Sequence, residues 1–189
     1  LVPWAVRNQR TIGEVRWLTT RGGISLYDGF HPGATGESDL AHTKTMPEVA
    51  HLNETEWDAF FHDRAVAWIR ENPGAAVVLA VRKVARTWSP VPNVAPYRSG
   101  SMAWISALWM TAILGFGAVG YWCCRKKRIE VFPLLLPVLA FTLLHAVYVG
   151  SIRYRVPVMP MIYVLTALGM CVFLTCLKTK ARERSRILP

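Results

Sequence analysis

The stretch Gly150-Ser-Ile-Arg-Tyr-Arg-Val-Pro157 lies between two long apolar runs. It is therefore predicted to be a short loop that joins two membrane helices. The loop places Arg153 and Arg155 at a membrane–water boundary, with Tyr154 between them. Two guanidinium groups held there can form an anion clamp, because each offers a planar fork of donors that suits a phosphate. If the loop is a strand-like turn, the two arginines share one face and Tyr154 points away.

The composition indicates a membrane protein. Of the 189 residues, 52% are hydrophobic, which is too apolar for an ordinary soluble domain. Three apolar runs near the ~20 residues that cross a bilayer are predicted to be transmembrane helices, at about 103–122, 131–149 and 157–177. The fold class we expect is mainly α: a multi-pass membrane protein with three C-terminal transmembrane helices after a polar segment.

The positive charge is concentrated in the second half of the chain. Residues 1–102 carry 11 Lys and Arg against 10 Asp and Glu, whereas residues 103–189 carry 11 against 2. The excess flanks the apolar runs, at 125–128 and in a basic tail at 178–189, so it predicts membrane topology rather than nucleic-acid binding. Both clusters are expected to be cytoplasmic. Residues 1–102 and the arginine loop are then extracytoplasmic.

The polar segment is expected to contain a β turn region and two helices. Residues 12–36 are predicted to hold a short β hairpin, with strands at 15–20 and 24–27 and a turn at Gly22-Gly23. A helix at about 54–71 follows Asn53, a candidate N-cap with Glu56 three residues on. The same Asn53 matches an N-glycosylation acceptor, but a cap is the preferred interpretation.

A second helix is predicted at about 75–88 and a linker at 89–101. This helix is basic and amphipathic, so it either lies in the membrane interface, which we favour, or packs on the first helix. Three prolines mark the linker.

Several motifs do not support the chemistry they suggest. The glycine-rich stretch at 28–36 can cradle phosphate but lacks the lysine and spacing of a P-loop, so a tightly folded surface loop is the preferred interpretation. Residues 115–120 match GxGxxG inside an apolar helix with no strand before it, which favours close helix packing over dinucleotide binding. The four cysteines lie in or beside apolar runs and predict no disulfide framework; acylation of Cys123 and Cys124 is the less favoured interpretation. No metal site is expected.

The chain opens on Leu1 without a charged region before a short apolar core. We therefore expect no signal peptide, and we expect a C-terminal piece of something longer.

Five motifs, in this order and on this topology, resemble bacterial polytopic glycosyltransferases of the GT-C superfamily. The branch is the one similar to protein O-mannosyltransferases and lipid A aminoarabinose transferases. The motifs are Pro3-Trp-Ala-Val-Arg7-Asn8, Thr20-Arg-Gly-Gly23-x-x-Leu26-Tyr27-x-Gly29-x-x-Pro32-x-Ala34-Thr35-Gly36, Arg70-Glu-Asn-Pro73, Lys83…Trp88-Ser-Pro90 and His145…Tyr148-x-Gly150-x-x-Arg153-Tyr154-Arg155-x-Pro157.

This resemblance implies an enzyme of the cell envelope in the bacterial cytoplasmic membrane. It would move a sugar from a polyprenyl-phosphate donor to a protein, lipid or glycan acceptor, with membrane lipids as further partners and no other cofactor. The catalytic base of the family lies in an earlier loop, before Leu1, so this piece alone is expected to be inactive. Candidate donor-phosphate residues are Arg153, Arg155, Tyr154 and His145; the alternative for the two arginines is binding of bulk lipid phosphates at the membrane surface.

The polar segment offers four weaker candidates: Gly22, Gly23, Tyr27 and Asp28. Asp28 could orient a sugar hydroxyl, although a solvated turn residue is the preferred interpretation. The competing function is a non-catalytic lipid-binding or scaffolding membrane protein. A transporter is weaker, since the predicted spans contain only His145 as an ionisable group and ion-coupled carriers usually bury carboxylates.

Overall fold

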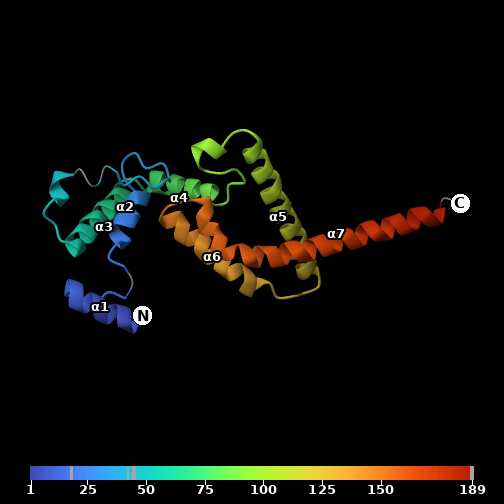
Figure 1. Ribbon diagram of the computed structural model, residues 1–189, viewed down its shortest axis with the longest axis horizontal. Coiled ribbons are helices and arrows are strands. Elements are labelled where there is room, and N and C mark those ends of the chain that lie inside the picture. Colours follow the sequence, from blue (N-terminus) through green and yellow to red (C-terminus); the bar gives the residue numbers. More distant parts are fainter. Residues whose placement is uncertain (18, 42, 44–45, 188–189) are drawn as a thin grey trace. The chain divides into compact units, whose positions relative to one another are not determined.

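The computed structural model describes residues 1–17, 19–41, 43 and 46–187, and it is mainly helical, with no strand among those residues. Its longer elements are drawn in Figure 1: α1 Val2–Ile12, α2 Gly22–Gly29, α3 Glu54–Glu71, α4 Pro73–Thr87, α5 Ser101–Lys126, α6 Phe132–Val147 and α7 Met159–Ile187. Short 3-10 helices also occur, among them η2 Pro47–Val49, η3 Ala95–Tyr97 and η4 Ile152–Val158. The chain divides into two compact units, residues 1–86 with 143–151 and residues 87–142 with 152–189.

The first unit is built around α3. The buried faces of α2 and α3 share a core whose centre is Phe61, with no exposed surface, and Tyr27, whose rings lie 5.0 Å apart. The Asn53 side chain caps α3 by accepting the backbone N–H of Glu56, and the Glu56 carboxylate accepts the backbone N–H of Asn53. This capping box is the one expected from the sequence, and the helix covers the range expected for it. Satisfying the first N–H groups in this way is worth about 1 kcal/mol.

The hairpin predicted for residues 12–36 is wrong. Gly22-Gly23 begins helix α2, and the residues expected as the second strand, 24–27, lie inside that helix. Of the residues expected as the first strand, 18 lies outside the described residues and the others are not in a strand. The local β propensity of these residues is overridden because Ile24 and Tyr27, three positions apart on a helix, both enter the core with α3.

Helix α4 begins at Pro73, two residues before the expected start, and its buried face packs on Phe30 and on the end of α3. Ala76 and Leu79 supply that face, and Trp68 and Ile69 of α3 lie against it. One face of α4 therefore packs on α3, as in the alternative that the sequence analysis left open. Val77, Val78 and Val81 are exposed on α4, so an interfacial position for its other side stays a prediction.

The second unit is dominated by the pair α5 and α7, which approach closely at two glycines. A Cβ atom on Gly120 would lie 2.0 Å from the carbonyl oxygen of Leu165, and one on Gly169 would lie 1.9 Å from that of Phe116. No side chain fits at such distances, so backbone meets backbone. The small-residue packing predicted for 115–120 is confirmed at Gly120, whereas Gly115 has nothing within 4 Å of its Cβ position.

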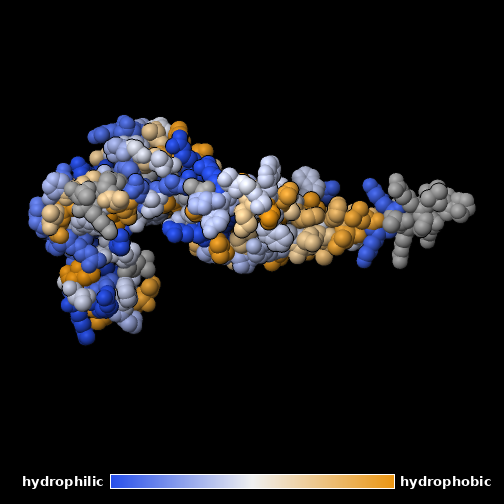
Figure 2. Space-filling model, turned by 45° about the horizontal axis from the view of Figure 1, so that its top comes forward, coloured by the Kyte–Doolittle hydropathy of each residue, from blue (hydrophilic) through white to orange (hydrophobic). Residues whose placement is uncertain are grey.

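Two helices in the described part of the chain are long and apolar enough to cross a membrane: α5, with 26 residues, and Ile152–Lys180, which includes most of α7. Figure 2 shows hydrophobic residues along much of α7, giving way to hydrophilic ones toward its end. Helix α6 has 16 residues with Pro137 inside, which is shorter than the span expected at 131–149. Three spans are thus not shown. In the expected cytoplasmic tail, the side chains after residue 180 lie outside the described residues.

Candidate functional site

The arginine loop is a 3-10 helix, η4, so the strand-like turn in which the two arginines would share a face is not formed. With three residues per turn, side chains two positions apart point about 120° away from each other. Arg153 and Arg155 therefore do not share a face in the way a strand would give. Pro157 lies within η4, and α7 starts at Met159 with Pro160 in its first turn, where a missing N–H costs nothing.

Arg155 is anchored to the backbone at the end of α4 and just after it. Its Nη1 atom donates to the carbonyl oxygens of Ser89 at 2.6 Å and Thr87 at 3.2 Å. Both bonds are charge-assisted, so they hold the guanidinium more firmly than neutral bonds would. Among the described residues, no hydrogen bond leaves Nε or Nη2 of Arg155. Because the guanidinium group is planar, the bonds of Nη1 also fix the positions of Nε and Nη2.

Arg153 is exposed and lies against its neighbour Tyr154. The Nη2 atom donates to the phenol oxygen at 3.0 Å, and the guanidinium carbon lies 5.0 Å from the ring centroid. Tyr154 therefore contacts Arg153, whereas in a strand-like turn it would have pointed away from both arginines. Stacking and hydrogen bonding together restrict the rotamers of an otherwise mobile side chain.

Both arginines line one groove, with a volume of about 320 Å³. Most of its remaining wall is apolar or aromatic and comes from the first half of α5, from η4 and from the start of α7: Trp109, Met110, Ile113, Ile152, Val156, Met159 and Tyr163, with Ser106. Two fixed cations on an apolar groove suit an amphiphile whose anionic group binds the guanidiniums while its tail lies on the wall.

The glycines of the first unit do not form an open phosphate cradle. The backbone N–H groups of Gly23 and Ile24, at the start of α2, donate to the Asp58 carboxylate of α3 at 2.7 and 3.2 Å. A Cβ atom on Gly23 would lie 1.9 Å from the Asp58 carbonyl oxygen, so this glycine allows α2 to approach α3. The anion at this helix start is supplied by the chain itself. Gly22 has open space around its Cβ position.

Asp28 is buried, with 3% of its surface exposed, so the preferred interpretation as a solvated turn residue is wrong. Its carboxylate accepts the backbone N–H of Asp39 at 2.8 Å. Tyr27 is a core residue that also stacks on His31, with ring centroids 5.3 Å apart. Both residues thus hold the loop after α2 in place.

A buried titratable residue that the sequence analysis did not place among the candidate site residues is Lys83, which has no exposed surface. Its Nζ atom donates to the Val147 carbonyl oxygen at 2.8 Å and lies 3.4 Å from the ring centroid of Phe30. Burial lowers the pKa of Lys83 to about 7, against a smaller raising effect of the Asp28 charge. The signal available in the sequence was a lysine on the apolar side of α4, four residues after Leu79.

Close backbone approach explains why Gly150 opens the arginine stretch. Its N–H donates to the Gly36 carbonyl oxygen at 3.2 Å, and a Cβ atom there would lie 2.3 Å from the Lys83 carbonyl oxygen. Arg86 donates to the Gly150 carbonyl oxygen at 3.4 Å and is ion-paired with Glu37. Gly150 is thus bonded to α4 through its carbonyl oxygen and to Gly36, in the loop after α2, through its N–H.

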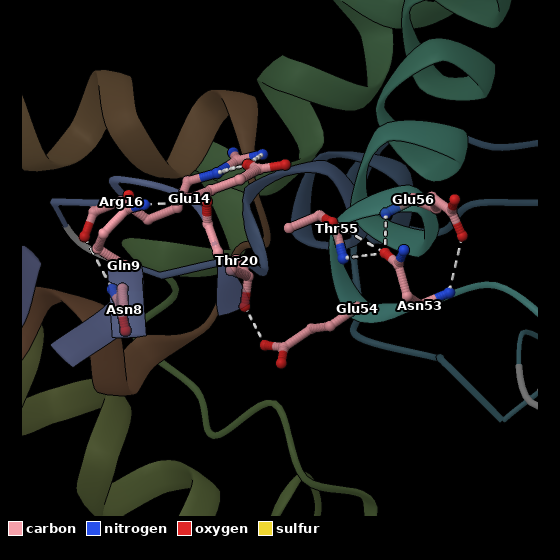
Figure 3. A network of polar contacts seen from close by, with 10 residues as sticks. Asn8, Gln9, Glu14, Arg16, Thr20, Asn53, Glu54, Thr55 and Glu56 are labelled. Atoms are coloured by element: carbon pink, nitrogen blue, oxygen red, sulfur yellow. Dashed lines mark hydrogen bonds and ion pairs between the residues drawn. The ribbon is translucent and has the colours of Figure 1, made fainter. Parts of the chain in front are cut away.

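Figure 3 shows how the polar contacts of the first unit connect its start to α3. The Asn8 amide donates to the Arg16 carbonyl oxygen at 2.8 Å, and the Thr20 hydroxyl donates to Glu54. These contacts explain the placement of Asn8, which is 3% exposed. They are structural bonds between groups of the chain itself.

The predicted site residues fall into two groups. Arg153, Tyr154 and Arg155 come together in the second unit. Gly22, Gly23, Tyr27, Asp28 and His145 belong to the first unit, where Nδ1 of His145 lies 3.2 Å from the Val149 carbonyl oxygen. Across the described residues, no cluster of three His, Cys, Asp or Glu side chains could hold a metal ion.

Comparisons with protein-family models, with curated proteins and with solved structures found no match to this chain.

Proposed function

We propose that the chain is the C-terminal part of an integral-membrane glycosyltransferase that moves a sugar from a polyprenyl-phosphate donor to an extracytoplasmic acceptor. The proposal includes a multi-pass position in a bacterial cytoplasmic membrane. The observation that carries it is the groove lined by Arg153 and Arg155 on otherwise largely apolar walls. A polyprenyl phosphate has the matching parts, a compact anion on a long hydrocarbon chain.

The chemistry assigned to the two arginines is electrostatic. When the bond between the sugar and the lipid phosphate breaks, negative charge grows on the departing phosphate. Cations already fixed by other contacts stabilise that charge more in the transition state than in the ground state. The anchors of Arg155 on Ser89 and of Arg153 on Tyr154 supply this fixation. The sugar, the acceptor and the general base are not assigned to residues of this chain.

The length of α5 supports the proposed topology. Ser106 lines the arginine groove, and Arg125 lies nineteen residues further along the same helix. At 1.5 Å per residue this is about 28 Å, close to the ~30 Å of hydrocarbon in a bilayer. The groove and the basic run at 125–128 would then lie at opposite interfaces. The basic run is assigned to the cytoplasm, so the groove faces outside.

The enzymatic test measures sugar transfer by the full-length protein in membranes, using labelled polyprenyl-phosphate hexoses and pentoses. Arg153→Gln should lower kcat/KM for the donor tenfold or more, because it removes a cation from the groove. Arg98→Gln removes an exposed cation from the linker before α5, outside the groove, and should leave transfer unchanged. Unchanged transfer in Arg153→Gln rejects the donor role. Arg153-dependent binding of the labelled donor with no transfer selects the lipid-binding alternative.

The topological test uses a cysteine-free background in intact cells. Arg153→Cys should react with a membrane-impermeant maleimide, whereas Lys127→Cys should react only after the membrane is permeabilised. Protection of position 153 in intact cells together with reaction at position 127 would reverse the orientation and exclude an extracytoplasmic groove.

A further inference from the structure

The last turn of α5 and the residues directly after it carry four consecutive cations and one unusual backbone conformation. We use the name basic turn for Arg125–Glu130. It closes α5 with two bonds, from the Ile129 N–H to the Cys124 carbonyl oxygen at 2.9 Å and from the Arg128 N–H to the Arg125 carbonyl oxygen at 3.1 Å. This pair of bonds is a Schellman motif, with Arg128 in the position that is usually glycine.

Arg128 has a φ of 54°, and it is the single non-glycine residue with positive φ within the described part of the chain. The left-handed conformation costs an ordinary side chain roughly 1 kcal/mol, a cost that glycine avoids. An arginine at this position therefore carries a local energetic penalty. Such a departure points to a role for the side chain beyond closing the helix.

Two pockets flank the basic turn and meet at Ile129. The first, of about 450 Å³, has a mainly apolar lining from α5 and α7 with one cation, Lys127; it includes all four cysteines, Cys123, Cys124, Cys171 and Cys176. The second, of about 460 Å³, lies beside the start of α6 and has Val131, Phe132, Leu135 and Tyr121 in its wall. Arg125 and Arg128 also line the second pocket, together with the carboxylate of Glu130.

We propose that the basic turn is a binding site for an anionic phospholipid of the bilayer. Arg125 and Arg128 bind the headgroup phosphate, Lys127 lies beside it, and the two acyl chains follow the two pockets on either side of Ile129. The charge balance favours an anion, since four cations outnumber the one carboxylate in 125–130. The apolar walls favour a lipid over a small soluble anion, which would leave them exposed to water.

This inference concerns the opposite end of α5 from the arginine groove, and it does not rest on the proposed transfer reaction. A specific site also differs from general attraction to an anionic membrane surface. General attraction depends on the total charge near the membrane, whereas the site depends on Arg128 in particular. The experiment can therefore compare two variants of equal net charge.

The experiment places the full-length protein in nanodiscs of phosphatidylcholine with 20 mol% phosphatidylglycerol and counts retained phosphatidylglycerol by native mass spectrometry. Arg128→Gly should retain at least fivefold less phosphatidylglycerol, because it removes the side chain that binds the headgroup, while glycine suits this left-handed backbone and leaves the turn intact. In pure phosphatidylcholine its unfolding temperature should equal or exceed that of the wild type, which separates lost binding from lost folding. Lys178→Gln removes one cation from α7 outside both pockets and should retain phosphatidylglycerol as the wild type does.

Two results would overturn the proposal. One is equal retention by Arg128→Gly and the wild type. The other is equal loss in Lys178→Gln and Arg128→Gly, which would indicate general surface attraction. Inorganic phosphate, added to protein in phosphatidylcholine nanodiscs, should not raise the unfolding temperature in an Arg128-dependent way. If it does so as strongly as phosphatidylglycerol, the pockets bind a free anion and the lipid assignment is wrong.

Discussion

Arg155 and Ser89 are joined by a 2.6 Å hydrogen bond, from a guanidinium nitrogen in η4 to a main-chain carbonyl oxygen just after α4. The same guanidinium lines the groove of the second unit. Arg155 therefore both anchors the backbone and lines the groove. Arg153 lines the groove but, among the described residues, makes no such bond to the backbone. The two arginines should respond differently to substitution.

Arg155→Ala should lower stability, because the carbonyl oxygens of Thr87 and Ser89 lose a charged donor. A lost bond of this kind costs about 1–3 kcal/mol, or a fall of roughly 3–10 °C in Tm for a chain of this length. Arg153→Gln should change Tm by less than about 2 °C, as expected for an exposed residue. Thermal unfolding of the full-length protein in detergent measures both values. Equal Tm values for the two variants would show that the Ser89 bond contributes nothing.

Gly120→Ala should separate α5 from α7, because its Cβ would overlap the backbone at Leu165. Overpacking against a rigid backbone costs about 1–3 kcal/mol or more. Gly115→Ala is the matched control, since its Cβ position is open, and it should be neutral or stabilise the helix by up to ~1 kcal/mol. Unfolding temperatures of the two variants test this difference. A stable Gly120→Ala protein would rule out the close contact.

Asp58→Ala should loosen the start of α2, because the N–H groups of Gly23 and Ile24 lose their carboxylate partner. Buried N–H groups left without an acceptor cost about 1–3 kcal/mol. Hydrogen exchange at these two amides should accelerate tenfold or more, while the amides in the second half of α3 keep their rates. Asp63→Ala, which removes a carboxylate 84% exposed on the same helix, should leave α2 unchanged. Slow exchange in Asp58→Ala would contradict the cap.

Lys83 should make stability depend on pH between about 7 and 10.5. In this range the unfolded chain binds a proton that the folded chain does not, since the pKa of Lys83 is lowered by folding. Stability therefore rises as the pH rises from 7 toward 10.5, by at most about 1.4 kcal/mol per pH unit for one proton. Below pH 7 the lysine is protonated in both states, and the full cost of burying the charge is constant.

The measurement compares unfolding free energies of the wild type and Lys83→Met at pH 7, 8.5 and 10. The advantage of Lys83→Met over the wild type should shrink as the pH rises. Arg82→Met, which removes an exposed cation from the same helix, should not show this change. Parallel pH profiles for Lys83→Met and the wild type would mean that Lys83 has an ordinary pKa when folded.

The helices with strong local signals were accessible to sequence reasoning. Asn53 and Glu56 form the expected capping box, and α3 has the expected bounds. The long apolar runs at α5 and α7 follow the composition directly. Residues 24–27 were misassigned because a short apolar stretch suits a strand or a buried helix equally, and only the contact with Phe61 decides between them.

The details of the candidate site needed contacts between residues far apart in sequence. The bond from Arg155 to Ser89 spans 66 positions and that from Lys83 to Val147 spans 64, and no local pattern encodes either one. The role of Gly23, predicted to lie in a hairpin turn, was missed for the same reason, because its N–H donates to the carboxylate of Asp58, 35 positions away. The sequence indicated the arginine pair, whereas the anchors that orient each guanidinium could not be derived from it.

The interlock of Gly120 with Gly169 has a mechanical consequence for α5 and α7. Where main chains touch without side chains between them, one helix cannot slide past the other by exchanging rotamers. The two helices therefore behave as one rigid body, in which neither can shift along the other. If both helices span a bilayer, as proposed, a change in bilayer thickness would have to be accommodated by a tilt of the whole pair, and its two ends would then move together.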